Sequence, residues 1–185
     1  MHRIAAVSLA FFLLGSLGFA QVPTAGNVFL GYSYMSADLP GSRANLNGWN
    51  ASLEGKVLPL LGIVADFSGN YGSQNLPLFT ACPGGALGAS CSVHEENFLF
   101  GPRLSISVGK FRPFIHGLIG ASHINEGVAG FFDSDTSFAD ALGGGLDYHL
   151  IPRISWRVQV DALQTRFFAA TQENVRVSTG VAFRF

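Results

Sequence analysis

The last twelve residues, 174–185, constrain the fold more strongly than any other stretch of the chain. They read N-V-R-V-S-T-G-V-A-F-R-F, with apolar or β-branched residues alternating with polar or small ones. Side chains alternate between the two faces of a strand, so this segment has one apolar face and one polar face. Strands of soluble sheets typically have about 5–6 residues, whereas a tilted strand needs about 9–11 to cross a bilayer. The pattern therefore predicts the closing strand of a transmembrane β-barrel.

Residues 1–20 have the organisation of a cleaved signal peptide. A basic start is followed by the apolar stretch Ile4–Leu14 and by the small-x-small cleavage site Gly18-Phe19-Ala20. The apolar stretch is too short for a spanning helix. We expect an exported chain with a single mature barrel domain over residues 21–185, because this length leaves room for one domain. A retained N-terminal anchor is the alternative.

Charge and composition exclude several classes of protein. Cleavage after residue 20 removes one of eleven Lys and Arg residues and none of the twelve Asp and Glu residues, so the net charge becomes −2. No basic excess remains to favour a nucleic acid partner. No mature segment offers about 18 uninterrupted apolar residues, so a helical membrane protein is not expected. An exported apolar chain of this kind can satisfy its backbone in lipid as a closed barrel.

Alternating hydrophobicity predicts eight strands, which is an even number, as in single-chain bacterial barrels. They are residues 27–35, 47–57, 62–71, 94–107, 112–124, 137–149, 153–165 and 174–185. The fold class expected is all-β, an eight-stranded antiparallel up-and-down transmembrane barrel. Long connections alternate with short ones: residues 36–46, 72–93, 125–136 and 166–173 are long, and 58–61, 108–111 and 150–152 are short. Short turns are expected on the periplasmic side, which places both termini in the periplasm.

Two groups of aromatic residues are expected at the two membrane interfaces. One belt near the periplasmic rim comprises Phe111, Tyr148, Trp156, Phe183 and Phe185. The belt near the outer rim comprises Tyr32, Tyr34, Trp49, Tyr71, Phe98 and Phe167. The soluble alternative is a lipocalin-like barrel with its apolar face turned inward, and it would have a polar outside without such belts.

The inward-facing positions carry ionisable residues that must pair, since an isolated buried charge is costly. They are Glu54, Lys56, Asp66, Arg103, Arg112, His116, Asp147, Arg157, Asp161, Arg176 and Arg184. An eight-stranded barrel is just wide enough for side chains to fill it. We therefore predict an Arg–carboxylate network that plugs the lumen, with its core on the last three strands. A narrow ion path or a proton relay is the alternative.

Cys82 and Cys91 lie in the longest expected outer loop. Two cysteines in an exported chain predict a disulfide. Metal binding is not expected, because no histidine accompanies them in that loop, and the sequence suggests no cofactor.

Catalysis is the less favoured alternative for this chain. An enzyme acting on outer-leaflet lipid would need a nucleophile and a base within hydrogen-bond reach at that height. His94 and His123 lie near the outer end, but no G-x-S-x-G motif accompanies them. The glycine run 143–145 is not a phosphate loop, since neither a Lys nor a helix start follows it. These glycines are expected to allow bending of the strand or close approach of side chains.

Three segments resemble those of the OmpA/OmpX-type outer-membrane β-barrel proteins: residues 111–121, 143–167 and 174–185. The resemblance implies an eight-stranded barrel in the outer membrane of a Gram-negative bacterium. It also implies insertion by the barrel assembly machinery, which reads terminal aromatic residues such as Phe183 and Phe185. It covers only the barrel, so no peptidoglycan-binding domain is expected.

This family shares a scaffold rather than a reaction, so the resemblance implies no enzymatic activity. We expect a non-enzymatic structural or surface-interaction protein that displays four outer loops. Its partners would be outer-membrane lipid, the assembly machinery and an unknown external ligand. The alternatives are a narrow small-solute channel and an outer-leaflet lipid-modifying enzyme.

Overall fold

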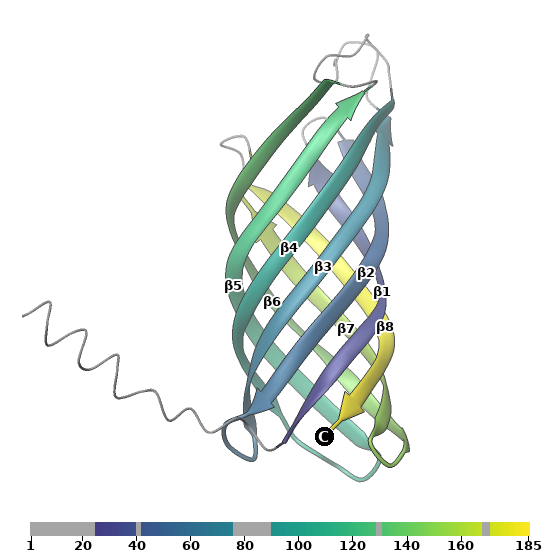
Figure 1. The fold of residues 1–185 in the computed structure, drawn as a ribbon, viewed down its shortest axis with the longest axis vertical. Helices are drawn as coiled ribbons and strands as arrows, with labels where there is room; N and C mark the ends of the chain where they lie inside the picture. Colours follow the sequence, from purple (N-terminus) through teal and green to yellow (C-terminus); the bar gives the residue numbers. More distant parts are fainter. Residues whose placement is uncertain (1–24, 40–41, 76–89, 129–130, 168–170) are drawn as a thin grey trace, which may run out of the picture.

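The computed structural model describes residues 25–39, 42–75, 90–128, 131–167 and 171–185, which form a closed barrel of antiparallel strands (Figure 1). The strands are β1 Gly26–Leu39, β2 Ser42–Lys56, β3 Leu61–Asn75, β4 Ser90–Ser105, β5 Phe111–Val128, β6 Phe131–Ile151, β7 Ile154–Thr165 and β8 Gln172–Arg184. Each strand pairs with its neighbours in the sequence, and β8 pairs with β1 to close the ring. The predicted eight-stranded up-and-down barrel is confirmed. No helix in the described part of the chain is long and apolar enough to span a membrane.

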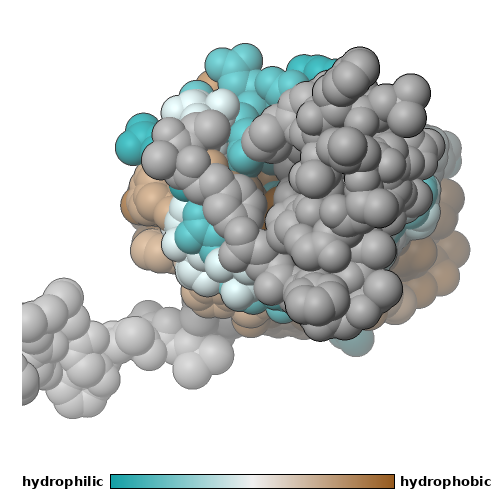
Figure 2. All heavy atoms as spheres, turned by 90° about the horizontal axis from the view of Figure 1, so that it is seen from above, coloured by the Kyte–Doolittle hydropathy of each residue, from teal (hydrophilic) through white to brown (hydrophobic). Residues whose placement is uncertain are grey.

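The barrel has an apolar outside and a polar inside. Along β8 the buried and exposed residues alternate, so that Arg176 and Ser178 face the lumen while Val175 and Val177 face outward. Hydrophobic residues cover much of the outer wall seen in Figure 2, and hydrophilic ones gather near the rim. This arrangement is the reverse of the soluble, lipocalin-like alternative, in which apolar side chains would fill the interior.

The two ends of the barrel differ, and we name them by their connections. The short-turn end carries residues 57–60, 106–110 and 152–153 between strands, and Phe185 lies there (Figure 1). The distal end is the opposite one, where β1 joins β2, β3 joins β4, β5 joins β6 and β7 joins β8. One of the short turns is closed by mutual backbone hydrogen bonds between Val108 and Phe111, with Gly109 in the left-handed region at φ 59°. This turn is where the sequence predicts it.

The aromatic side chains lie at both ends of the outer wall, with one exception. Ten of the eleven predicted belt residues face outward, among them Trp49 at the distal side and Phe111 at the short-turn end. The prediction for Phe167 was wrong, because its side chain is fully buried and joins the apolar cluster inside the barrel. Phe167 follows the end of β7 with the same parity as the lumen-facing Leu163 and Thr165, so continuing the alternation places its side chain inside.

The strands extend farther at the distal end than predicted. Residues 36–46 and 125–136 were expected to be loops, but β1 pairs with β2 as far as Leu39↔Ser42, and β5 pairs with β6 as far as Val128↔Phe131. A strand that continues beyond the bilayer no longer needs an apolar outer face. The hydrophobic alternation therefore stops before the backbone pairing does. At the other end Arg153, predicted to begin a strand, lies in the turn before β7 with φ 74°.

Two predictions fall outside the described residues. The signal peptide, residues 1–20, is not among them, and neither is Cys82. Cys91 belongs to β4, but its side chain is not described. The cleavage and the disulfide both stay predictions.

Candidate functional site

The lumen near the short-turn end is built around two buried carboxylates, of which Glu54 on β2 is the first. Arg103 on β4 donates to Glu54 Oε2 at 3.2 Å. Glu54 Oε1 lies 3.0 Å from Lys56 Nζ and 3.5 Å from Arg112 Nη2. Three cations from three strands therefore share one carboxylate.

Asp147 on β6 is the second carboxylate at this level. Arg157 on β7 binds it with two bonds, Nε to Oδ1 at 2.6 Å and Nη2 to Oδ2 at 3.0 Å. This bidentate pairing is among the strongest that a guanidinium forms. Arg184 Nη2 lies 3.7 Å from Asp147 Oδ2. The mouth tier is our name for these two carboxylates and their five cations: Glu54, Lys56, Arg103, Arg112, Asp147, Arg157 and Arg184.

The central tier lies deeper in the barrel and is organised around Arg176 on β8. Its guanidinium lies 2.8 Å from Asp161 Oδ2 on β7 and 2.9 Å from Asp66 Oδ1 on β3. His116 Nε2 lies 2.7 Å from Asp161 Oδ1, and Arg103 Nη2 lies 3.1 Å from His116 Nδ1. Arg103 thus connects the two tiers. We use central tier for Asp66, His116, Asp161 and Arg176.

Several of these bonds cross the lumen instead of following its wall. Arg176 connects β8 to Asp66 on β3, and these strands are not neighbours in the ring. Gln159 on β7 donates to Asn50 Oδ1 on β2 at 3.2 Å, and Asn50 Nδ2 in turn donates to Asp66 Oδ1 at 3.0 Å. The side chains of the central tier therefore fill the cross-section of the barrel.

Aromatic rings and glycines make room for this packing. Phe114 lies beneath two guanidiniums, 4.3 Å from Arg103 and 4.8 Å from Arg157. Gly143 on β6 faces the central tier, and a Cβ added there would lie 2.0 Å from Asp161 Oδ1. The close approach expected of the glycine run is thus realised at Gly143.

A cluster of buried apolar residues lines much of the lumen from the level of the central tier towards the distal end. It comprises Met35, Ala37, Ala44, Leu46, Val64, Val93, Leu99, Leu118, Ile124, Ala139, Ala141, Leu163 and Phe167. Glu95 is also buried there, and Asn97 and Ser122 both donate to its Oε1. Sequence reasoning missed this layer. A signal existed in β5, where both faces carry aliphatic residues.

The structure places all eight predicted network residues inside the barrel and gives each a charged or hydrogen-bonding partner. They are Glu54, Asp66, Arg103, His116, Asp147, Arg157, Asp161 and Arg176. The prediction omitted the neutral members Asn27, Asn50 and Gln159, because only ionisable side chains were counted. Their inward position in the strand alternation could have identified them. Phe183 and Phe185, the predicted assembly signal, are both exposed on the outer wall.

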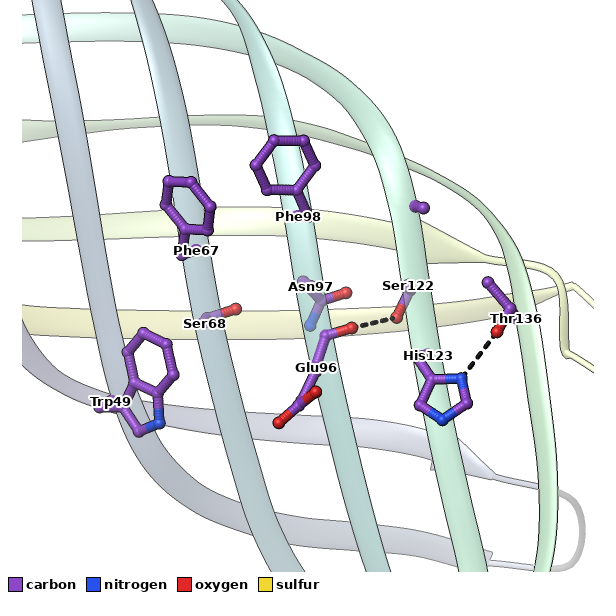
Figure 3. A pocket seen from close by; sticks show the side chains of 10 residues that line it. Trp49, Phe67, Ser68, Glu96, Asn97, Phe98, Ser122, His123 and Thr136 are labelled. Carbon is purple, nitrogen blue, oxygen red and sulfur yellow. Dashed lines mark hydrogen bonds between the residues drawn. The ribbon is translucent and has the colours of Figure 1, made fainter.

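A groove of about 330 Å³ lies on the outer wall over β2 to β6. Figure 3 shows Phe67 and Phe98 side by side in it, with ring centroids 4.8 Å apart. His123 Nδ1 lies 2.7 Å from Thr136 Oγ1. Glu96 faces His123 across the β4–β5 pair, but its ion pair is with His94 at 3.2 Å.

Among the described residues that line the groove, His123 contacts the hydroxyl of Thr136, whereas the carboxylate of Glu96 pairs with His94. Within the described residues no carboxylate hydrogen-bonds His123, whereas a catalytic histidine needs such a group to orient it. No three His, Cys, Asp or Glu side chains of the described part of the chain gather as a metal site.

The fold defines a class, the small eight-stranded barrels of bacterial outer membranes. Neisserial surface protein A has this fold, with a TM-score of 0.67 and 11% sequence identity over 87% of this chain and 99% of that one. Ail, the attachment invasion locus protein of Yersinia pestis, superimposes with a TM-score of 0.59 and 16% identity over 87% and 98% of the two chains.

The N-terminal β-barrel domain of Pseudomonas aeruginosa OprF is also similar, with a TM-score of 0.55 and 11% identity over 86% of this chain and 99% of that domain. At these identities the likeness establishes the fold alone. No protein-family model and no curated protein matches the sequence. The chain therefore has the fold expected from its resemblance to OmpA/OmpX-type barrels.

Proposed function

We propose that this chain is a non-enzymatic integral protein of a Gram-negative outer membrane, with a plugged lumen and a structural or surface-interaction role. The observation that carries the proposal is the set of bonds across the lumen. Arg176 joins β8 to β3 through its buried ion pair with Asp66, and Gln159 joins β7 to β2. Paired and hydrogen-bonded charges that fill an eight-stranded barrel leave little room for a solute path.

The outer wall supports the membrane location. Its exposed apolar side chains, such as Leu142 at 73% exposure, suit lipid and would be a liability in water. The aromatic residues at both ends suit the two interfaces. The similar folds of surface protein A and Ail support the same location.

The distal end is the part proposed to face outward and meet a partner. The strands β5 and β6 extend there to Val128 and Phe131, beyond the apolar part of the wall. Ail, with the same fold, has been crystallised with the heparin analogue sucrose octasulfate. That complex supports an external ligand for a barrel of this kind. The remaining proposed partners are membrane lipid and the barrel assembly machinery.

Labelling of single cysteines tests this location and sidedness. In a chain with Cys82→Ser and Cys91→Ser, we would introduce Arg43→Cys at the distal end or Lys110→Cys in a short turn; both positions are exposed. An impermeant thiol reagent applied to intact cells should label only Arg43→Cys. Lys110→Cys should react after the outer membrane is permeabilised. Labelling of Lys110→Cys in intact cells would contradict the proposed orientation.

A further inference from the structure

The mouth tier carries more positive than negative charge. Its five cations, Lys56 and four arginines, face the carboxylates of Glu54 and Asp147, and their ion pairs go to these two alone within the described residues. Five positive charges against two negative ones leave an excess of three in this tier, and the central tier, with Asp66 and Asp161 against Arg176, reduces the excess of the two tiers together to two. Such an excess is costly in a partly desolvated site unless an anion offsets it.

The excess charge is located on the side chains that solvent can reach. Arg103 and Arg157 are fully buried. Arg103 lies 3.2 Å from Glu54 and Arg157 lies 2.6 Å from Asp147, and each is the nearest arginine to its carboxylate. The side chains of Lys56, Arg112 and Arg184 are 15%, 10% and 20% exposed. Arg112 and Arg184 make the longest ion pairs of the tier, at 3.5 and 3.7 Å. These three cations therefore form a partly open group at the short-turn end.

Neutral side chains position Lys56, Arg112 and Arg184, and some N–H donors of this group have no acceptor in the described part of the chain. Ser105 Oγ lies 2.6 Å from Lys56 Nζ and 2.8 Å from Arg112 Nη2, which holds two cations on one hydroxyl. Arg184 Nη1 contacts the ring of His149. Nε and Nη2 of Arg184 have no hydrogen-bond acceptor among the described residues. Nε of Arg103 and Nη1 of Arg157 also lack an acceptor among the described residues, so several guanidinium donors of this tier are free to bind an anion.

The surroundings favour the entry of an anion from this end. The turn residues between the strands here include Lys110 and Arg153 and no acidic residue. The outward-facing acidic residues Asp38 and Glu173 lie at the distal end. An asymmetric field of this kind raises the local concentration of anions at the short-turn end.

We propose that Lys56, Arg112 and Arg184 bind a phosphate group at the mouth of the barrel. Arginine forks and a lysine ammonium together suit a phosphate, whose several oxygens can accept from all three side chains, better than a monatomic anion. The phosphate can be a free ion or the headgroup of an anionic phospholipid at the adjacent rim. This site goes beyond the proposed function. Binding of a lipid headgroup requires the barrel to lie in a membrane, whereas binding of free phosphate does not.

Calorimetric titration of the folded barrel with inorganic phosphate tests the site. In an uncharged detergent, we expect phosphate to bind more tightly than chloride at equal ionic strength. Lys56→Gln and Arg184→Gln should each weaken phosphate binding about tenfold, as expected for losing one charge-assisted contact. Lys110→Gln removes the same charge from an exposed turn of the same end, and it should change the affinity less than twofold. Phosphate should also raise the urea midpoint of the wild type, because a ligand of the native state stabilises it.

Two kinds of lipid nanodisc distinguish the sources. If the lipid headgroup is the ligand, discs that contain phosphatidylglycerol should weaken the binding of inorganic phosphate relative to discs of phosphatidylcholine. If free phosphate is the ligand, the two affinities should agree. The proposal is wrong if the wild type binds phosphate no better than chloride, or if Lys110→Gln weakens binding as much as Arg184→Gln. The comparison of phosphate with chloride uses the wild type alone, so it remains a valid test even if a variant fails to fold. This comparison is also independent of the proposed function. An open channel would contradict the proposed function but would not decide whether phosphate binds.

Discussion

At the scale of single residues, each buried charge is held by more than one partner. His116 illustrates this best, because a guanidinium can only donate. Its Nδ1 must therefore accept from Arg103, and its Nε2–H must donate to Asp161. Both ring nitrogens are thus engaged, one by a guanidinium and one by a carboxylate. Losing either partner would leave a buried polar atom unsatisfied, which typically costs about 1–3 kcal/mol.

The glycine beside this contact provides a residue-scale prediction. A methyl at Gly143 would lie 2.0 Å from Asp161 Oδ1 and 2.6 Å from the backbone oxygen of Val160, so the carboxylate must move. We expect Gly143→Ala to lower the free energy of unfolding by about 1–3 kcal/mol, the usual cost of overpacking. Gly117→Ala is the matched control, since nothing lies within 4 Å of the added Cβ. Equilibrium urea unfolding in vesicles measures both, and equal effects would show that the contact is unimportant.

At the scale of strands, alternation alone revealed most of the fold. The period of two in β7 and β8 fixes both the strand and its lumen face, because one residue of slip would turn every charge into the lipid. The alternation did not predict where the strands end, because residues 36–39 and 125–128 continue the backbone pairing without the alternating apolar residues of an outward face. Phe167 was misplaced although it shares the parity of the lumen-facing Leu163 and Thr165, because the prediction assigned it to the outer rim as an aromatic residue of the loop.

The last strand also carries the predicted assembly signal. Phe185 exchanges two backbone hydrogen bonds with Gly26, so deleting it would remove pairing as well as the ring. Phe185→Ala keeps the backbone and removes only the ring. We expect this variant to reduce the folded barrel in cells several-fold, measured by heat-modifiable migration, while refolding into vesicles without the machinery stays close to wild type. A refolding defect of the same size in vesicles would show that the ring acts in stability and not in recognition.

At the scale of the whole molecule, closure of the ring brings together charges that are far apart in the sequence. Arg103 meets Glu54 across 49 positions, and His116 meets Asp161 across 45. The sequence placed these residues inside the barrel, but their partners depend on how the strands are staggered around the ring. The excess of cations in the mouth tier could be recognised only once these partners were known.

Conductance across a planar bilayer tests the plugged lumen most directly. The barrel is folded in detergent, checked by heat-modifiable migration and inserted at the level of single molecules. We predict that the wild type stays at baseline, because Arg176 and Gln159 span the cross-section and further buried side chains, many of them apolar, occupy the lumen beyond them. Arg176→Ala removes the ion pair with Asp66 that joins β8 to β3, and it should show openings that the wild type lacks. Steady, open conductance by the folded wild type, unchanged in Arg176→Ala, would contradict the plug and favour a channel.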